Sequence, residues 1–213
     1  MKKSIKCIIF DCDGVLVDSE PISISTIVQL ANEIGIAMDY DYGVRTFVGN
    51  SWKNVAAILE DKLGRPLPPK FEETYRKTSF DRFKKELTAV AGVSDLIPQL
   101  TLPFCVASSG PPHKIRLNLQ LTKLLPYFEG RIYSCYDIQK WKPDPAIYKH
   151  AAQSMGFEPK ECLVVEDSLF GVKAGVASGC QVYAYAAMAH NKAALTAAGA
   201  HLFYDIEELK ELI

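Results

Sequence analysis

Two acidic pairs in this 213-residue chain have the spacing of a metal-binding site. Asp11 and Asp13 are separated by one residue, and Glu166 and Asp167 are adjacent. Each pair directly follows a short apolar run, so each is expected where a buried strand ends. Four carboxylates in one pocket need a cation to remain ionised together. Hard oxygen ligands in this number suit Mg²⁺, so we expect these residues to bind magnesium.

Each acidic pair also has a purely structural explanation. The segment from Asp11 to Gly14 could be an Asx-type turn that leaves a strand. Glu166 and Asp167 could cap the N-terminus of a helix, where acidic side chains are favoured. The metal hypothesis therefore requires both pairs to reach the same edge of one sheet.

Two further segments carry groups that could hold a phosphate. Lys142, between a tryptophan and a proline, could reduce the repulsion between a carboxylate and a phosphate dianion. Ser108 and the backbone N–H groups of Ser109 and Gly110 could bind phosphoryl oxygens. Taken alone, a lysine is usually solvated, and a serine at a strand-to-helix junction is about as often a helix cap.

The elements that must position these residues follow an α/β pattern. Stretches of helical period separate most of the apolar, β-branched runs, which is typical of a parallel sheet covered by helices on both faces. We therefore predict a Rossmann-like, doubly wound sheet, with ligands at the carboxyl ends of its strands. The predicted strands are residues 5–10, 104–107, 131–134, 162–165 and 181–185.

One long segment breaks this alternation. Residues 15–85 contain several stretches with apolar residues at helical spacing and no convincing strand. We therefore predict a helical second domain at residues 15–85, inserted into a core domain of residues 1–14 and 86–213. The predicted helices of the insertion are residues 19–33, 52–63 and 69–85.

Composition excludes several classes of protein. Hydrophobic residues make up 48% of the chain and charged residues 23%, as in an ordinary globular protein. The formal net charge of -1 argues against a nucleic-acid partner, which needs an excess of Lys and Arg. No apolar stretch approaches the ~18 residues of a membrane span. We expect a monomer that binds a small molecule, with neither nucleic acid nor membrane as a partner.

Cysteine usage and the first residues favour a cytoplasmic protein. The six cysteines include no C-x-x-C pair, and most stand in or beside apolar runs, as small core residues do. The chain begins with lysines and an apolar run, like a signal peptide. That run stops at Phe10 and acidic residues follow at once, which a signal peptide would not tolerate.

The chemistry-bearing segments resemble, in order, the motifs of the haloacid dehalogenase-like (HAD) superfamily. The resemblance is to its phosphatase and β-phosphoglucomutase-like branch, in which a helical cap follows the first strand, and the chain looks most like bacterial sugar-phosphate phosphatases. It implies a Rossmann-like core and a phosphoric monoester hydrolase. The matching segments are IIFDCDGVLVDSE at 8–20, VASSG at 106–110, KWKPDPAIY at 140–148 and VVEDSLFGVKAG at 164–175.

The resemblance implies a role for each matching residue. Asp11 would attack phosphorus and form an aspartyl-phosphate. Asp13 would protonate the leaving alcohol and then activate the water that cleaves the intermediate. Ser108 and Lys142 would bind the phosphoryl group. Because dehalogenases of the superfamily lack an acid at the position of Asp13, carbon–halogen cleavage is disfavoured.

The resemblance also implies a magnesium site. Asp11, the backbone carbonyl of Asp13, and Asp167 would bind Mg²⁺. Glu166 would either bind the ion directly or hold one of the groups that bind it.

A segment of the predicted cap resembles the family's substrate-specificity loop, with Gly49, Asn50, Trp52 and Lys53 as candidate substrate contacts. β-Phosphoglucomutases carry an arginine three residues after the loop glycine and a histidine shortly after the first motif. This chain has Trp52 and Ser23 at those positions. Hydrolysis is therefore favoured, a phosphomutase is the alternative, and a non-catalytic regulatory module comes third.

Overall fold

The computed structural model of the protein describes residues 5–187 and 192–212. The chain forms two compact units, one joining Met1–Asp18 to Thr88–Ile213 and the other comprising Ser19–Leu87. Each unit has its own core and is described here by itself. None of the helices in the described part of the chain is long and apolar enough to cross a membrane.

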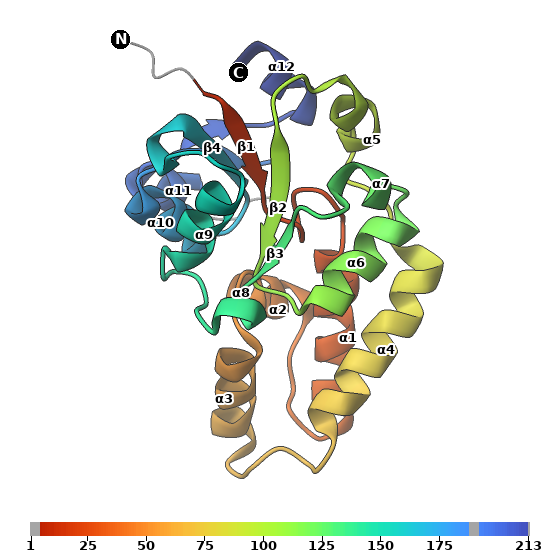
Figure 1. The fold of residues 1–213 in the computed structure, drawn as a ribbon. Helices are drawn as coiled ribbons and strands as arrows, with labels where there is room; N and C mark the ends of the chain where they lie inside the picture. Colours follow the sequence, from red (N-terminus) through yellow and green to blue (C-terminus); the bar gives the residue numbers. More distant parts are fainter. Residues whose placement is uncertain (1–4, 188–191, 213) are drawn as a thin grey trace. The chain divides into compact units, whose positions relative to one another are not determined.

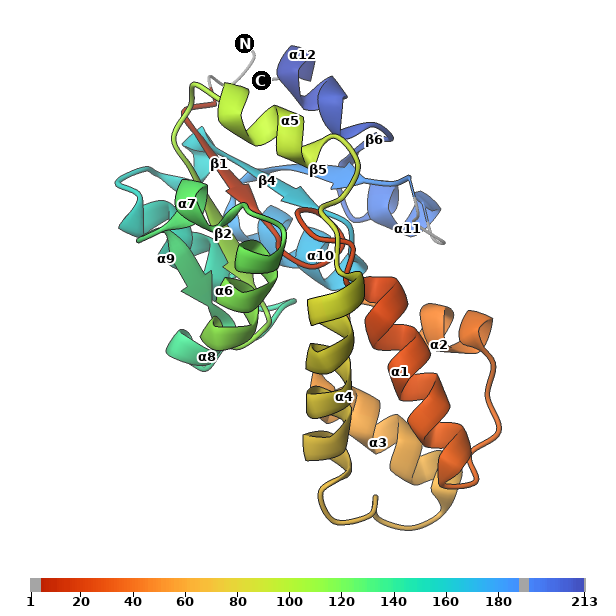
Figure 2. The ribbon, with the colours of Figure 1, turned by 90° about the vertical axis from the view of Figure 1, so that its right-hand side faces the viewer.

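The first unit is built on a parallel sheet of six strands in the order β3-β2-β1-β4-β5-β6 (Figures 1 and 2). This confirms the predicted α/β class. The sixth strand was not predicted, because its three residues form too short an apolar run to stand out. The strands are β1 (Cys7–Phe10), β2 (Phe104–Ser108), β3 (Ile132–Ser134), β4 (Cys162–Glu166), β5 (Gln181–Tyr185) and β6 (His201–Phe203).

Helices cover the sheet because its central strands are apolar on both faces. All residues of β1, β2 and β4 are buried, as in a sheet with helices on each side. The helices of this unit are α5 (Val93–Leu96), α6 (Pro112–Leu121), α7 (Leu125–Phe128), α8 (Cys135–Ile138), α9 (Ala146–Ser154), α10 (Leu169–Ser178), α11 (Lys192–Ala197) and α12 (Leu209–Leu212). The described part of the unit also contains three 3₁₀ turns, η1 (Ile97–Gln99), η2 (Pro159–Glu161) and η3 (Ile206–Glu208).

Alternate residues of β1 point into different layers. Cys7 and Ile9 belong to the core formed with α9 and α10. Phe10 is buried with Phe104 and Phe128, and the three rings meet edge to face with centroids 5.2 to 6.4 Å apart. Both layers fix the direction in which β1 leaves the sheet, and therefore the position of the residues that follow it.

The boundary of the first unit lies a few residues beyond the predicted one. Residues 15–17 are fully buried. Val17 forms bridges with Asp13 and Ala89, and the Leu16 carbonyl accepts a hydrogen bond of 3.1 Å from the Val90 N–H. These bonds attach the turn after β1 to the returning chain, so the division falls after Asp18 and before Thr88.

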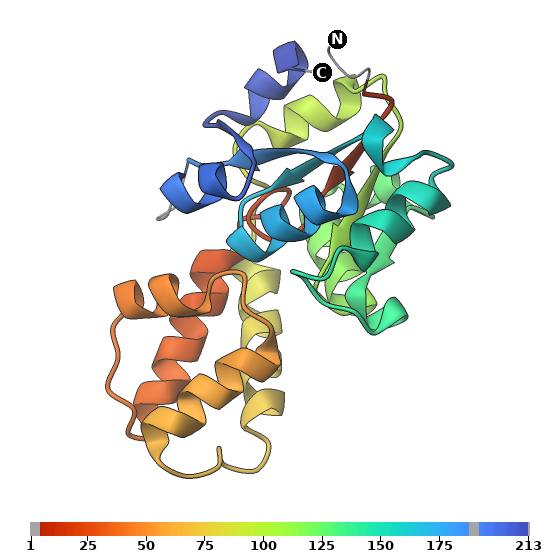
Figure 3. The same cartoon turned by 90° about the vertical axis from the view of Figure 1, so that its left-hand side faces the viewer.

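The second unit consists of four helices. They are α1 (Glu20–Glu33), α2 (Tyr40–Phe47), α3 (Trp52–Leu63) and α4 (Phe71–Glu86). Figures 2 and 3 show α1 and α4 side by side. Ile27, Leu30 and Leu59 are among the buried residues of the unit's own core. Helix α2 was not among the predicted ranges; its start is fixed by Asp39, whose side chain accepts a 2.6 Å bond from the Tyr42 N–H.

Phe128→Ala should lower the free energy of unfolding by about 3–5 kcal/mol, because it removes a buried ring that contacts two others. Urea denaturation of the whole chain measures the change. Tyr127→Ala, at the exposed neighbouring position, is the control and should change it by less than about 1 kcal/mol. Equal losses in both variants would contradict this account of the core.

Candidate active site

The polar residues meet where three neighbouring strands end. Asp11 follows β1, Ser108 is the last residue of β2, and Glu166 is the last residue of β4. Because β1 pairs in parallel with both β2 and β4, these three residues lie at one edge of the sheet. The structure therefore brings the first and fourth predicted segments together, as the metal hypothesis requires.

A buried lysine links the two acidic segments. The Lys142 Nζ atom donates hydrogen bonds to Asp11 Oδ1 at 2.5 Å, to Glu166 Oε1 at 2.6 Å and to the Ala107 carbonyl at 3.3 Å. Only 5% of its side chain is exposed. The three donors of the ammonium group thus have three acceptors, so this lysine is not a solvated one.

The Glu166 carboxylate is fully buried and shared among several donors. Its Oε1 atom accepts bonds from Lys142 and from the Tyr148 hydroxyl, both at 2.6 Å. Its Oε2 atom accepts bonds from the N–H groups of Asp167 and Ser168 and from the Ser168 hydroxyl, at 2.9 to 3.0 Å. This carboxylate is therefore held by α9 on one side and by the start of α10 on the other.

Burial and the neighbouring charges shift the pKa values of Asp11, Glu166 and Lys142. Burial raises the pKa of Asp11 to about 7, and the nearby Lys142 offsets only part of the rise. Burial would also raise the pKa of Glu166, but Lys142 and the bonds from Tyr148 and Ser168 bring that pKa below its ordinary value. For Lys142, burial lowers the pKa, and the two carboxylates outweigh it and raise the pKa well above its usual range.

The acidic cluster fits a divalent cation. Asp11, Glu166 and Asp167 each offer an oxygen, and these atoms lie within 4.8 Å of one another. Burial is the main cause of the raised pKa of Asp11, the Glu166 and Asp13 carboxylates add to it, and Lys142 offsets only part of the rise. Both oxygens of Glu166 already accept bonds from the protein, and Asp11 and Asp167 are the residues of this group that could hold a cation directly. The Asp13 side chain is outside this group of oxygens.

Two glycines make the acidic cluster sterically possible. A Cβ atom on Gly14, whose φ is +82°, would lie 2.1 Å from Asp167 Oδ2. A Cβ atom on Gly171 would lie 1.7 Å from Glu166 Oε1. Because neither contact leaves room for a side chain, Gly14 lets Asp167 approach the turn after β1, and Gly171 lets Glu166 pack against the start of α10.

Asp13 is held by side chains of α6. Its Oδ1 atom accepts hydrogen bonds from Lys114 Nζ at 2.9 Å and from Asn118 Nδ2 at 3.2 Å. Neither of these two residues was predicted to belong to the site. Their spacing of four residues, in a helix beginning just after the Ser-Ser-Gly segment, would have placed both on one helical face.

The Ser-Ser-Gly segment after β2 is folded onto itself. The Gly110 N–H donates a 3.0 Å bond to Ser108 Oγ, and the Gly110 carbonyl accepts a 2.6 Å bond from Ser134 Oγ. The Ser109 hydroxyl faces Cys135 Sγ at 3.9 Å. The Gly110 N–H, which was expected to bind a phosphoryl oxygen, therefore has an acceptor within the protein.

The predicted cap contacts belong to the second unit and are defined there. Gly49 has a φ of +72°, and Asn50 Nδ2 donates a 2.7 Å bond to the Thr46 carbonyl. Lys53 is exposed. Trp52 stacks against Tyr75, with ring centroids 5.0 Å apart and an angle of 15° between the planes.

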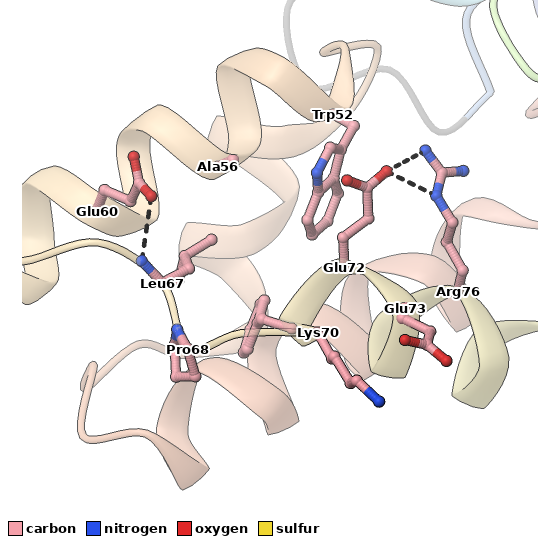
Figure 4. A pocket seen from close by; sticks show the side chains of 10 residues that line it. Trp52, Ala56, Glu60, Leu67, Pro68, Lys70, Glu72, Glu73 and Arg76 are labelled. Atoms are coloured by element: carbon pink, nitrogen blue, oxygen red, sulfur yellow. Dashed lines mark hydrogen bonds and ion pairs between the residues drawn. The ribbon is translucent and has the colours of Figure 1, made fainter.

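Trp52 also borders a groove of about 630 Å³ in this unit. Figure 4 shows that α3, the loop that follows it and the start of α4 line the groove. Glu72 pairs with Arg76 at 2.6 Å, and Glu60 accepts a 3.1 Å bond from the Leu67 N–H. Part of the charge around the groove is therefore already compensated.

Comparison with known proteins gives a consistent family. The model of the family described as "Haloacid dehalogenase-like hydrolase" matches residues 8–185. The 6-phosphogluconate phosphatase of Escherichia coli (strain K12) is 36% identical over 189 residues, covering 88% of this chain and 86% of that protein.

Solved structures agree with this match. A conserved haloacid dehalogenase-like protein from Agrobacterium tumefaciens superposes with a TM-score of 0.87 at 31% identity, covering 98% of this chain and 97% of that one. A HAD family hydrolase from Deinococcus radiodurans, with bound phosphate and sodium, gives a TM-score of 0.82 at 27% identity, with coverage of 99% and 96%.

Without bound metal, the Asp11→Asn protein should become more stable relative to the parent protein as pH rises. The pKa of an unfolded Asp is about 3.9, whereas that of Asp11 in the folded protein is about 7. The folded state therefore holds this proton more tightly, and the resulting stability is complete below about pH 4 and lost as pH rises through about 7.

Melting temperatures in a chelator, between about pH 5 and pH 8, test this expectation. The melting temperature of Asp11→Asn minus that of the parent should increase by several degrees over this range. Asp61→Asn, at an exposed position of α3, controls for the loss of a carboxylate elsewhere. A difference for Asp11→Asn that stays constant with pH would contradict the assignment.

Gly171→Ala should destabilise the protein by about 1–3 kcal/mol, since the new methyl group overlaps the Glu166 carboxylate. Helix propensity alone predicts the opposite sign, a gain of about 0.5–1 kcal/mol. Chemical denaturation measures the change, and Ala177→Ser at an exposed position of the same helix is the control. A gain in stability would show that Glu166 has room to move.

Proposed function

The chain belongs to the haloacid dehalogenase-like hydrolase family and is a phosphoric monoester hydrolase, and from this premise we propose that it removes phosphate from a small phosphorylated sugar or sugar acid, with Mg²⁺. The observation that carries the proposal is the contact of Lys142 with both Asp11 and Glu166 at the carboxyl edge of the sheet. A carboxylate beside a fully hydrogen-bonded lysine has the surroundings that attack on a phosphate dianion requires.

Asp11 is the proposed nucleophile. One of its oxygens attacks phosphorus, and the bond from phosphorus to the ester oxygen breaks. The departing alcohol takes a proton from Asp13. Asp13, now a carboxylate, takes a proton from water as that water attacks the aspartyl-phosphate, which releases phosphate and regenerates Asp11.

Lys142 and Glu166 act together in this proposal. Lys142 reduces the repulsion between the Asp11 carboxylate and the incoming phosphate and stabilises negative charge as it develops. Glu166 fixes the lysine by the 2.6 Å bond and is itself fixed by Tyr148. We therefore assign Glu166 to positioning Lys142 rather than to direct metal binding.

The metal and the phosphoryl group have separate ligands in the proposal. Asp11, Asp167 and the backbone carbonyl of Asp13 would hold Mg²⁺, which when bound neutralises charge on the phosphate. The Ser108 hydroxyl and the Ser109 N–H would bind phosphoryl oxygens. For Gly110, the same role requires its N–H to exchange the bond with Ser108 Oγ for one with the substrate.

The second unit is proposed to select the substrate. Gly49, Asn50, Trp52 and Lys53 occupy the segment expected to read the leaving group. The E. coli relative is named for a sugar-acid phosphate, which supports a substrate of that class. The monomeric state and the cytoplasmic location remain predictions.

A panel of sugar phosphates, sugar-acid phosphates and nucleotides, scored for released phosphate with Mg²⁺, tests the proposal. Asp11→Asn should lower kcat by at least about a thousandfold, because it removes the nucleophile, whereas the exposed Asp61→Asn should retain full activity. A chelator should abolish turnover, and acid quenching during turnover should trap phosphate on the parent protein but not on Asp11→Asn.

Other outcomes would assign another function. Conversion of a sugar 1-phosphate to its 6-isomer without net phosphate release would identify a phosphomutase. Absence of turnover across the whole panel would instead favour a non-catalytic role, and activity that survives in Asp11→Asn would exclude the proposed nucleophile.

A further inference from the structure

Helix α6 presents two donors to a single oxygen of Asp13. Lys114 and Asn118 stand four residues apart on α6, and both bond Oδ1. The side chains of Lys114 and Asp13 are only 19% and 17% exposed. Two donors from one helix fix the carboxylate more firmly than one flexible lysine would, because the helix sets their spacing.

The burial of Asn118 indicates that its amide has a purpose beyond packing. The residue is fully buried, and its own Oδ1 atom has no hydrogen-bond partner. An unsatisfied buried amide oxygen costs free energy that an apolar side chain would avoid. The side-chain hydrogen bond that the structure gives this amide is the one to Asp13.

The other oxygen of Asp13 lies toward the Ser-Ser-Gly segment. A Cβ atom on Gly110 would lie 3.8 Å from Asp13 Oδ2 and 3.4 Å from Ser108 Oγ. Oδ1 therefore accepts the two α6 bonds, and Oδ2 is the oxygen on the side of the proposed phosphoryl-binding groups.

We propose that Lys114 and Asn118 are positioning residues that hold Asp13 by Oδ1, so that Oδ2 exchanges the proton with the ester oxygen and with water. The inference rests on the proposed function and deepens it. In the first step, the proton leaves Oδ2 for the ester oxygen as its bond to phosphorus breaks. In the second, Oδ2 takes a proton from the attacking water as the bond from phosphorus to Asp11 breaks.

Leaving-group dependence tests this inference. The value of kcat/KM depends only on the steps up to and including departure of the alcohol. p-Nitrophenolate is a good leaving group that needs no proton from an acid, whereas an alkoxide needs one. Lys114→Met and Asn118→Leu should therefore lower kcat/KM for an alkyl phosphate by about 30-fold or more, and for p-nitrophenyl phosphate by less than about 3-fold. Asp13→Asn should show the same pattern more strongly.

Two further variants separate positioning from other causes. Lys114→Arg keeps a cationic donor and should recover most of the activity toward the alkyl phosphate. Lys149→Met, at an exposed position of α9, should behave as the parent protein does. Equal losses on both substrates would mean that Lys114 binds the substrate directly, and would overturn the inference, as would no loss on either.

A crystal structure of Lys114→Met gives a readout that does not depend on turnover. The Asp13 carboxylate should leave the orientation it has in the parent protein, while Asp11 and Lys142 should stay in place. An unmoved Asp13 would overturn the inference even if the protein is an active phosphatase. A parent protein without activity would instead contradict the proposed function, and the orientation of Asp13 would still decide the positioning role.

Discussion

The contact of one buried ammonium group with two carboxylates is the constraint on which the rest of the core unit depends. Lys142 brings a charge into a place where only 5% of its side chain meets solvent. An isolated charge there would be very costly. Asp11 and Glu166 compensate it, and each needs the lysine for the same reason. Removal of Lys142 would leave two carboxylates in the interior without a compensating charge, so the nucleophile and its electrostatic partner are stabilised as a unit.

This constraint explains why the surrounding elements have the sequence they do. β1 and β4 must be adjacent and parallel, because only then do Asp11 and Glu166 reach the same lysine. Tyr148 on α9 and the Asp167 and Ser168 groups at the start of α10 supply the remaining donors to Glu166. A buried carboxylate needs such donors on both oxygens, so both helices serve the site as well as the core.

Much of this arrangement could be predicted from the sequence, because buried strands appear as apolar runs and polar residues mark where they end. The α/β class and the strands that lead to Asp11, Ser108 and Glu166 were predictable for that reason. The parts that were missed depend on packing between elements distant in the sequence. No local pattern shows that Asn118 would reach Asp13 or that the Gly110 N–H would turn to Ser108.

The close approach of Gly171 to Glu166 has a consequence for how this protein can change over evolutionary time. A side chain at position 171 would overlap the long carboxylate at position 166, so position 171 cannot gain one without cost unless residue 166 moves or is shorter. We expect the two to change together, with a larger residue at 171 appearing only beside a shorter one at 166. A shorter residue at 166 would no longer reach Lys142. Substitution at these two positions would therefore also require a change in the segment that carries Lys142.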